Sequence, residues 1–223
     1  MSSAEAFPIW LSLRVAALAM VIVTPLGVWI AWTQATKRYR LRTLVDALVL
    51  LPFVLPPSVI GFFLVVIFGR RGLVGRWLEE VLGLRIIFTP AAAVLAACIV
   101  AFPILVKTVQ PSIEAVPAEL HAVGSSLGLG PLALFFRVTL RAAWPGVVTG
   151  LVLAFVRAVG EFGATLMFAG NIPGETNTMA LEIFAAYQAG DDARALVYVL
   201  VLSIMSSLTV VVAARLSPQQ VPS

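Results

Sequence analysis

Long apolar stretches alternate with short polar connections along the chain. A membrane-spanning helix needs about 20 predominantly apolar residues, because it must cross a hydrocarbon layer about 30 Å thick. Stretches that satisfy this requirement are residues 9–32, 47–69, 86–106, 145–169 and 195–214. Tryptophan or tyrosine lies near several of their ends, as expected at a membrane–water interface. The pattern therefore predicts an all-α integral membrane protein with about five transmembrane helices.

The composition supports this fold class and excludes others. Hydrophobic residues make up 61% of the chain and charged residues 12%, whereas about a quarter of residues are charged in soluble domains. No basic cluster with interleaved aromatics is present, so we expect lipid and not nucleic acid around the protein. Cys98 is the only cysteine, which rules out an intrachain disulfide and leaves a packing role. The first apolar stretch is too long for a secretory signal and has no Lys or Arg before it, so we expect it to remain.

The positions of Lys and Arg predict an orientation. Those in the connections that would share one side of the membrane number eight: Lys37, Arg38, Arg40, Arg42, Lys107, Arg137, Arg141 and Arg215. The opposite side receives five: Arg70, Arg71, Arg76, Arg85 and Arg194. Because cytoplasmic connections carry the excess of positive charge, we expect a multi-pass protein with its N-terminus outside and its C-terminus in the cytoplasm.

The second apolar stretch contains Pro52, Pro56 and Pro57. Each proline removes a backbone donor and disturbs the preceding turn. A broken helix is tolerated where protein or a wet cavity, not lipid, meets its freed carbonyl groups. We favour a broken segment that lines a transport pathway, because such helices recur at transporter sites. A kink that serves packing alone is the alternative.

The connection over residues 110–141 is long for a loop and has helical patterns. Pro111 and Pro117 act as helix start signals, and Ser112 can cap a first helical turn. Apolar residues recur at three- and four-residue spacing after Ala118. Gly128 and Gly130 end this pattern, and Pro131 begins a second helix. Two short helices at an angle would form a cytoplasmic knob that fits a groove on a soluble partner.

Three sequence motifs resemble a known family. The stretch "SSLGLGPLALFFRVTL", followed by "PGVVTG", resembles the coupling loop of type I ABC importer permeases. The stretches "LPFVLPPSVIGFFLVVIFGRRGLVG" (51–75) and "GEFGATLMFAGNIPGETNTMALEIF" (160–184) are similar to the molybdate branch of these binding-protein-dependent permeases. The likeness extends from about residue 10 to residue 214.

The resemblance implies a type I ABC importer transmembrane domain over residues 9–216, in a bacterial inner membrane. It also implies a homodimer that forms the pathway, an extracytoplasmic oxyanion-binding protein, and separate ABC ATPase subunits that hold ATP and Mg. The sequence has no G-x-x-x-x-G-K-[ST] phosphate loop, so we expect no cofactor on this chain. The implied substrate is molybdate. Tungstate and sulfate are alternatives, because all three are tetrahedral dianions.

In the loop, the family's usual acidic residue is replaced. The residues expected to meet the ATPase are Glu119, His121, Ala122, Val123, Gly124, Gly128 and Gly130. His121 and Ala122 stand at the positions of the missing acid, and Gly124 stands where a small residue is usual. His121, the only histidine, is interpreted either as solvent-facing without a role or as a partner contact. No metal site or acid–base catalysis is expected, because no second ligand or carboxylate accompanies it.

Arg157 and Glu161 are ionisable residues in the fourth apolar stretch, four residues apart and thus on one helix face. Charges near a bilayer centre are costly and therefore face the protein interior. We favour an intramembrane ion pair that fixes the helix among its neighbours. The alternative is that Arg157 meets an anionic substrate. Candidate polar contacts along the pathway are Ser58, Thr165 and Asn171.

Two other function classes fit the sequence less well. A membrane-embedded enzyme needs clustered Asp, His, Ser or Cys, and the chain has one His and one Cys, so we expect no catalytic residue. A stand-alone, ion-driven secondary transporter often shows inverted internal repeats, and the sequence has none. A permease subunit without enzymatic activity is the favoured interpretation.

Overall fold

The computed structural model describes residues 3–37 and 39–216, and in this part of the chain it contains helices and no strand. The helices are α1 (Ser3–Thr36), α2 (Arg42–Val54), α3 (Pro57–Phe68), α4 (Leu73–Leu82), α5 (Pro90–Glu114), α6 (Ala118–Ser126), α7 (Pro131–Leu134), the π-helical turn η1 (Phe135–Thr139), α8 (Leu140–Ala142), α9 (Trp144–Val159), α10 (Gly163–Phe168), α11 (Met179–Gln188) and α12 (Asp192–Leu216). The all-α prediction is confirmed.

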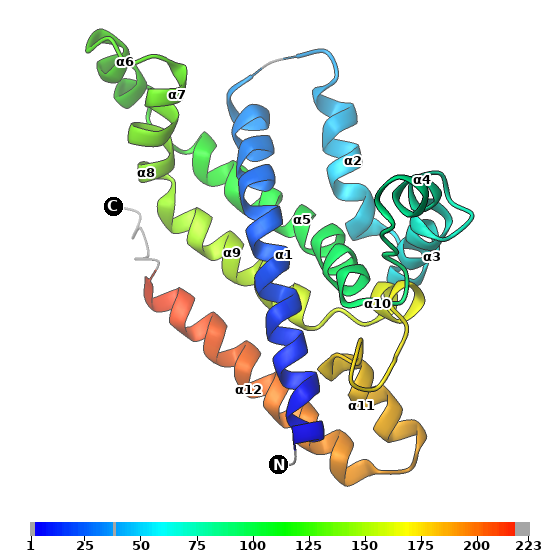
Figure 1. The fold of residues 1–223 in the computed structure, drawn as a ribbon. Coiled ribbons are helices and arrows are strands. Elements are labelled where there is room, and N and C mark those ends of the chain that lie inside the picture. Colours follow the sequence, from blue (N-terminus) through cyan, green and yellow to red (C-terminus); the bar gives the residue numbers. More distant parts are fainter. Residues whose placement is uncertain (1–2, 38, 217–223) are drawn as a thin grey trace.

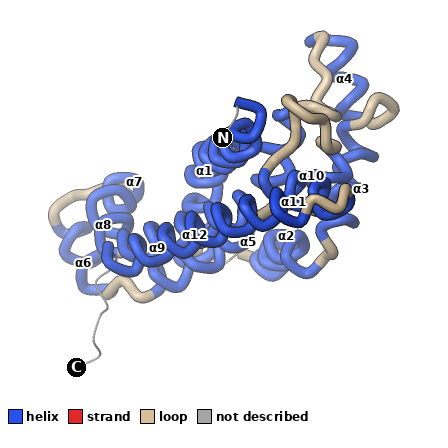
Figure 2. Tube along the Cα trace, turned by 90° about the horizontal axis from the view of Figure 1, so that it is seen from below, coloured by secondary structure: helices blue, strands red, loops and turns tan. Residues whose placement is uncertain are grey.

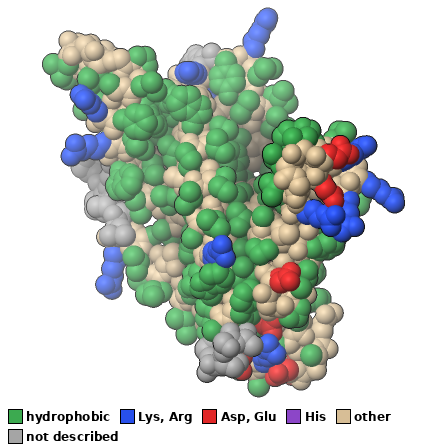
Figure 3. Space-filling view, in the orientation of Figure 1, with side chains coloured by type: hydrophobic (Ala, Val, Ile, Leu, Met, Phe, Trp, Pro, Cys, Tyr) green, Lys and Arg blue, Asp and Glu red, His purple; other side chains and the backbone are tan. Residues whose placement is uncertain are grey.

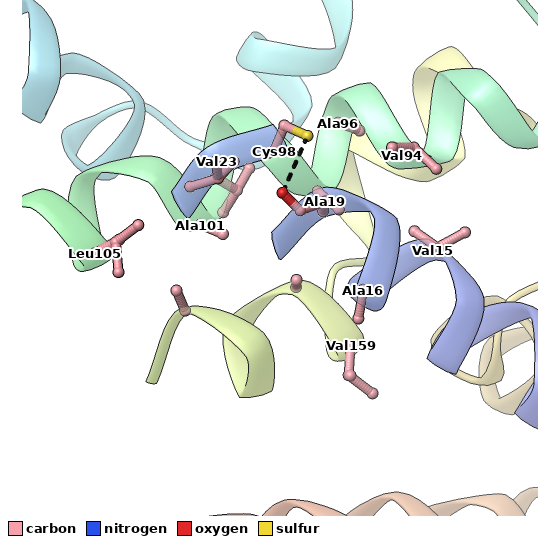
Figure 4. Close-up of a cluster of buried hydrophobic side chains, with 14 of the residues drawn as sticks. Val15, Ala16, Ala19, Val23, Val94, Ala96, Cys98, Ala101, Leu105 and Val159 are labelled. Carbon is pink, nitrogen blue, oxygen red and sulfur yellow. Dashed lines mark hydrogen bonds between the residues drawn. The ribbon is translucent and has the colours of Figure 1, made fainter. Parts of the chain in front are cut away.

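The centre of the molecule is a bundle in which α5 packs between α1 and α9 (Figure 1). Small residues are frequent in this packing: Ala16 and Ala19 of α1 and Ala96 and Ala101 of α5 belong to one buried cluster (Figure 4). Small side chains let helix backbones approach closely, which is how helices associate where lipid supplies no hydrophobic driving force. Cys98 belongs to this packing, with its Sγ 3.8 Å from the carbonyl oxygen of Ala19. Helix α12 packs along α9 and α11 at the edge of the bundle.

In the described part of the chain, three helices are long and apolar enough to cross a membrane: α1, α5 and α12. The number rises to five if each of two bent helix pairs counts as one span. One pair is α2 and α3, with a bend of 111°, and the other joins residues 131–142 to α9, with a bend of 75°.

The sequence boundaries need three corrections. The stretch 145–169 is not one helix, because α9 ends at Val159 and α10 begins at Gly163. Pro111 and Ser112 do not start a helix, because α5 continues through them to Glu114. The knob therefore begins after Glu114. The connections also contain two helices that the sequence did not predict, α4 and α11.

Candidate functional site

The second apolar stretch breaks between α2 and α3, at consecutive prolines. The backbone N–H of Leu55 still donates to the carbonyl of Leu51 at 3.0 Å, and Pro56 then takes an extended conformation before Pro57 opens α3. Proline suits a first helical position because it has no N–H to satisfy there. The break turns the chain by 111° and places Ser58, which is exposed, in the first turn of α3.

Helix α3 packs against α10 through glycines. A Cβ on Gly61 would lie 2.6 Å from the Cβ of Met167, and one on Gly163 would lie 2.8 Å from the Cβ of Pro57. The start of α10 therefore lies against the start of α3, near Ser58. Thr165 of α10 is 1% exposed, so its side chain is enclosed by protein in this conformation.

Arg157 and Glu161 meet, although they do not share a helix. Gly160 ends α9, and the Glu161 N–H donates to the carbonyl of Ala158 at 3.2 Å in a tight final turn. Glu161 Oε2 lies 2.7 Å from Arg157 Nη1, without the alignment of a hydrogen bond, and Oε1 accepts the N–H of Ala164 at 2.8 Å. The Glu161 side chain is 2% exposed and that of Arg157 is 32% exposed. The carboxylate thus bridges the end of α9 and the start of α10.

The segment after α10 folds back on its own polar groups. Thr176 Oγ1 donates to the Gly170 carbonyl at 3.2 Å and accepts the Ile172 N–H at 2.9 Å. Asn177 Nδ2 donates to Glu182 Oε2 at 3.1 Å. These bonds hold a compact loop beside α11.

Asn171 lines a pocket of about 590 Å³ together with Asn177, Glu182 and Arg194. The Oδ1 of Asn171 is buried without a hydrogen-bond partner. Neither Ser58 nor Thr165 lines this pocket. The structure therefore brings Ser58 close to α10 but does not join the three candidate pathway residues in one cavity.

The knob consists of α6 and the helix over residues 131–142. Gly128 has φ +78°, a left-handed conformation that ends α6, and Gly130 precedes α7. The buried Gly124 lets α6 approach its neighbour, since a Cβ there would lie 2.4 Å from Leu134 Cδ2. Glu119, Ala122 and Val123 are exposed.

Large apolar side chains of α6 and of Leu127, which directly follows it, are exposed. Leu120 and Val123 are exposed, and Leu127 is 75% exposed. Leu132 and Phe136 of the second helix are exposed as well. We call these residues the knob surface: Leu120, Val123, Leu127, Leu132 and Phe136. Large apolar side chains exposed on two adjoining short helices indicate an interaction site.

The interpretation of His121 as solvent-facing is wrong. His121 is half-buried, and its Nε2 lies 2.9 Å from Oγ1 of the buried Thr139. The side chain therefore joins the two helices of the knob. No group of His, Cys, Asp and Glu suited to a metal ion occurs in the described part of the chain.

A polar network that the sequence reading missed connects α1, α2 and α5. The fully buried Gln34 donates from Nε2 to Asp46 Oδ1 at 3.2 Å, and Lys107 Nζ lies 2.5 Å from the same oxygen. Arg42 Nη2 lies 3.4 Å from Glu114 Oε1. The sequence feature that could have indicated this network is the position of Asp46 and Lys107. Both lie near ends of spans that are predicted to share one side of the membrane.

Comparisons with known proteins agree with this architecture. The chain matches, over residues 23–221, the family described as "Binding-protein-dependent transport system inner membrane component". A Haemophilus influenzae protein named "Molybdenum transport system permease protein ModB" is 39% identical over 202 residues, which cover 89% of this chain and 88% of the relative. The Escherichia coli K12 protein of the same name is 40% identical over 178 residues, which cover 80% and 78%.

Solved structures share the fold. A chain of a bacterial ABC transporter that imports alginate has a TM-score of 0.77 at 13% identity, with 100% of this chain and 82% of that chain covered. A chain of the MetNI methionine ABC transporter has a TM-score of 0.72 at 18% identity, with 97% and 98% covered. The observed fold is thus the type I ABC importer transmembrane fold.

Proposed function

The chain belongs to the family of binding-protein-dependent transport system inner membrane components, and from this premise we propose that it is the permease subunit of an ATP-driven molybdate importer. One observation carries the substrate: 39% identity over 89% of the chain to a relative named as a molybdenum transport permease. Tungstate and sulfate remain alternative cargoes of the same charge and shape.

The proposed permease works as a homodimer with two separate ATPase subunits. The knob surface supports the docking of an ATPase, because it places apolar side chains outside the bundle on short helices next to α5 and α9. ATP binding would bring the ATPases and the attached knobs together, and hydrolysis would release them. This is a population shift between two states of the permease. ATP and Mg belong to the ATPase and not to this chain.

The proposed pathway passes the break between α2 and α3. Ser58 offers an exposed hydroxyl there, close to α10. Thr165 and Asn171 would contribute only after a rearrangement, because Thr165 is enclosed and Asn171 lies at another pocket. Since Glu161 neutralises Arg157, the path carries no strongly attractive fixed cation at this point, which suits a dianion that must leave again.

The proposed orientation places the N-terminus outside and the C-terminus in the cytoplasm. Ion pairs of Arg42 with Glu114 and of Lys107 with Asp46 hold the start of α2, directly after the α1–α2 connection, beside the last part of α5. At the other end, Tyr198 OH donates to the Glu5 carbonyl at 2.9 Å, so the start of α12 lies beside the start of α1. These contacts support the two groups of connections assigned to the two sides.

Uptake into vesicles tests the function. The permease is reconstituted into vesicles with its ATPase and an oxyanion-binding protein. The accumulation of radioactive molybdate is then measured with ATP supplied either inside or outside the vesicles. We expect uptake that requires ATP and both partners. Uptake driven by a proton or sodium gradient without ATP would refute the proposal. Calorimetric titration of the binding protein with molybdate, tungstate and sulfate separates the three cargoes.

A further inference from the structure

Helix α4 presents an apolar face that no other described element covers. Leu73 is 85% exposed, Trp77 54% and Val81 60%. Their spacing of four residues puts the three side chains on one helix face. Arg76 and Glu80 border this face on the side of Leu73. Helix α4 packs mainly against α3, through the side that carries the buried Gly75. The helix is therefore amphipathic, with its apolar side directed away from the protein.

The position of α4 in the fold is at the end of a membrane span. It follows α3, which is apolar after Ser58, by four residues and precedes α5, which begins at Pro90. Figures 1 and 2 show α4 at the periphery beside α3, apart from α12. A helix that joins the end of one span to the start of the next lies at the membrane boundary.

Arginines flank α4 in the sequence: Arg70 and Arg71 precede it and Arg85 follows it. Arg70, Arg71 and Arg85 line a hollow of about 610 Å³ with Phe88. Arg85 Nη2 lies 2.7 Å from Glu79 Oε1, whereas Arg70 and Arg71 have no carboxylate within ion-pair distance among the described residues. Figure 3 shows charged side chains gathered over this region. The hollow is thus cationic and has two guanidinium groups available.

We propose that α4 is an interfacial helix that lies in the surface of the bilayer, with Leu73, Trp77 and Val81 among acyl chains and Arg70 and Arg71 on lipid phosphates. Tryptophan and leucine on one face with arginine nearby is the composition of helices that lie at the headgroup boundary. Tryptophan is also enriched at this depth. The outer leaflet follows from the proposed orientation, whereas the contact with lipid does not depend on the transport function.

A second protein copy is the main competing occupant. The centres of protein interfaces are depleted of charged residues, whereas here two arginines without a carboxylate partner directly precede the amphipathic helix. Phosphates supply the complementary charge together with acyl chains for the apolar side chains. Phospholipid is therefore the favoured occupant.

Spin labels test the lipid contact in the full-length protein. In a Cys98→Ala background, single variants Leu73→Cys, Trp77→Cys and Val81→Cys are labelled and reconstituted in phosphatidylcholine vesicles with phosphatidylglycerol. Collision with oxygen, which concentrates in hydrocarbon, is compared with collision with a water-soluble nickel chelate. We expect a several-fold higher ratio of oxygen to nickel collisions at these positions than at the control Glu175→Cys, an exposed position in the loop after α10.

Two results would overturn the proposal. If labels at all three apolar positions are shielded from both oxygen and nickel, protein covers the face. If nickel collisions dominate, the face lies in water.

The arginines are tested by lipid composition. Raising the phosphatidylglycerol fraction should increase the oxygen-to-nickel ratio of the Trp77→Cys label. An Arg70→Gln/Arg71→Gln double variant should lose this dependence, and the matched control Arg137→Gln/Arg141→Gln should keep it. If the oxygen-to-nickel ratio responds equally to phosphatidylglycerol in the parent protein and in both double variants, Arg70 and Arg71 do not contact lipid.

Discussion

At the residue scale, Glu161 has more contacts than its spacing from Arg157 suggests. One carboxylate oxygen lies 2.7 Å from the Arg157 guanidinium. The other accepts a hydrogen bond from the backbone N–H of Ala164, in the first turn of α10. The sequence indicated the contact, but not the backbone that makes it. Gly160 ends α9, and the carboxylate then joins two helices instead of two turns of one helix. A helical spacing could not reveal this, because the break depends on how α10 packs on α3.

Replacement of Glu161 tests this bridge. Glu161→Gln keeps an acceptor for Ala164 N but removes the charge beside Arg157, and we expect it to lower the free energy of unfolding by about 1–3 kcal/mol. The lower part of this range is expected because Arg157 is one-third exposed and water screens its charge. Denaturant titration of the full chain in detergent measures the change.

An Arg157→Gln variant completes a double-mutant cycle. The double variant should lose less stability than the sum of the two single losses, since each single variant leaves one charge without its partner. Strictly additive losses would show that the two charges are not coupled.

At the element scale, the knob was the part most accessible to sequence reasoning. The glycines that end α6 and the proline that starts α7 are local signals, and both boundaries lie where they were predicted. Helix α4 was missed because its ten residues lie in a charged connection, where apolar residues were read as loop. The extension of α5 was missed because Pro111 was taken as a start. Packing against the bundle overrides that local signal.

A charge on the knob surface should prevent docking of the ATPase. Leu127→Asp and Val123→Asp are expected to weaken co-purification of the ATPase at least about tenfold, because a central interface side chain contributes roughly 2 kcal/mol or more. Ser125→Asp adds the same charge to α6 outside the knob surface and should leave the complex intact. Undiminished complex with Leu127→Asp would place the docking site elsewhere.

At the scale of the whole molecule, two groups of ion pairs lie at the two ends of the bundle. The Asp46–Lys107 and Arg42–Glu114 pairs lie at one end, and the Glu182–Arg194 pair lies at the other. Sequence charge counts assign sides to connections but do not show which connections touch. The structure supplies the contacts, and together they make one consistent topology.

Cysteine labelling checks the topology. In a Cys98→Ala background, a membrane-impermeant maleimide added to intact spheroplasts should label Glu175→Cys, in the loop after α10, and should not label Ser126→Cys, in α6. Both positions are exposed, so permeabilised cells serve as the control in which both react. The reverse labelling pattern would invert the protein in the membrane.

The bend between α2 and α3 also has a consequence for the order in which the chain inserts into the membrane and folds. The two helices have 13 and 12 residues, which gives lengths of about 20 Å and 18 Å, and neither alone crosses about 30 Å of hydrocarbon. The insertion machinery therefore receives residues 42–68 as one hydrophobic stretch. The surface on which α3 rests, Ala164 and Met167 of α10, leaves the ribosome only much later. The final bent geometry is completed after insertion, when the second half of the chain arrives.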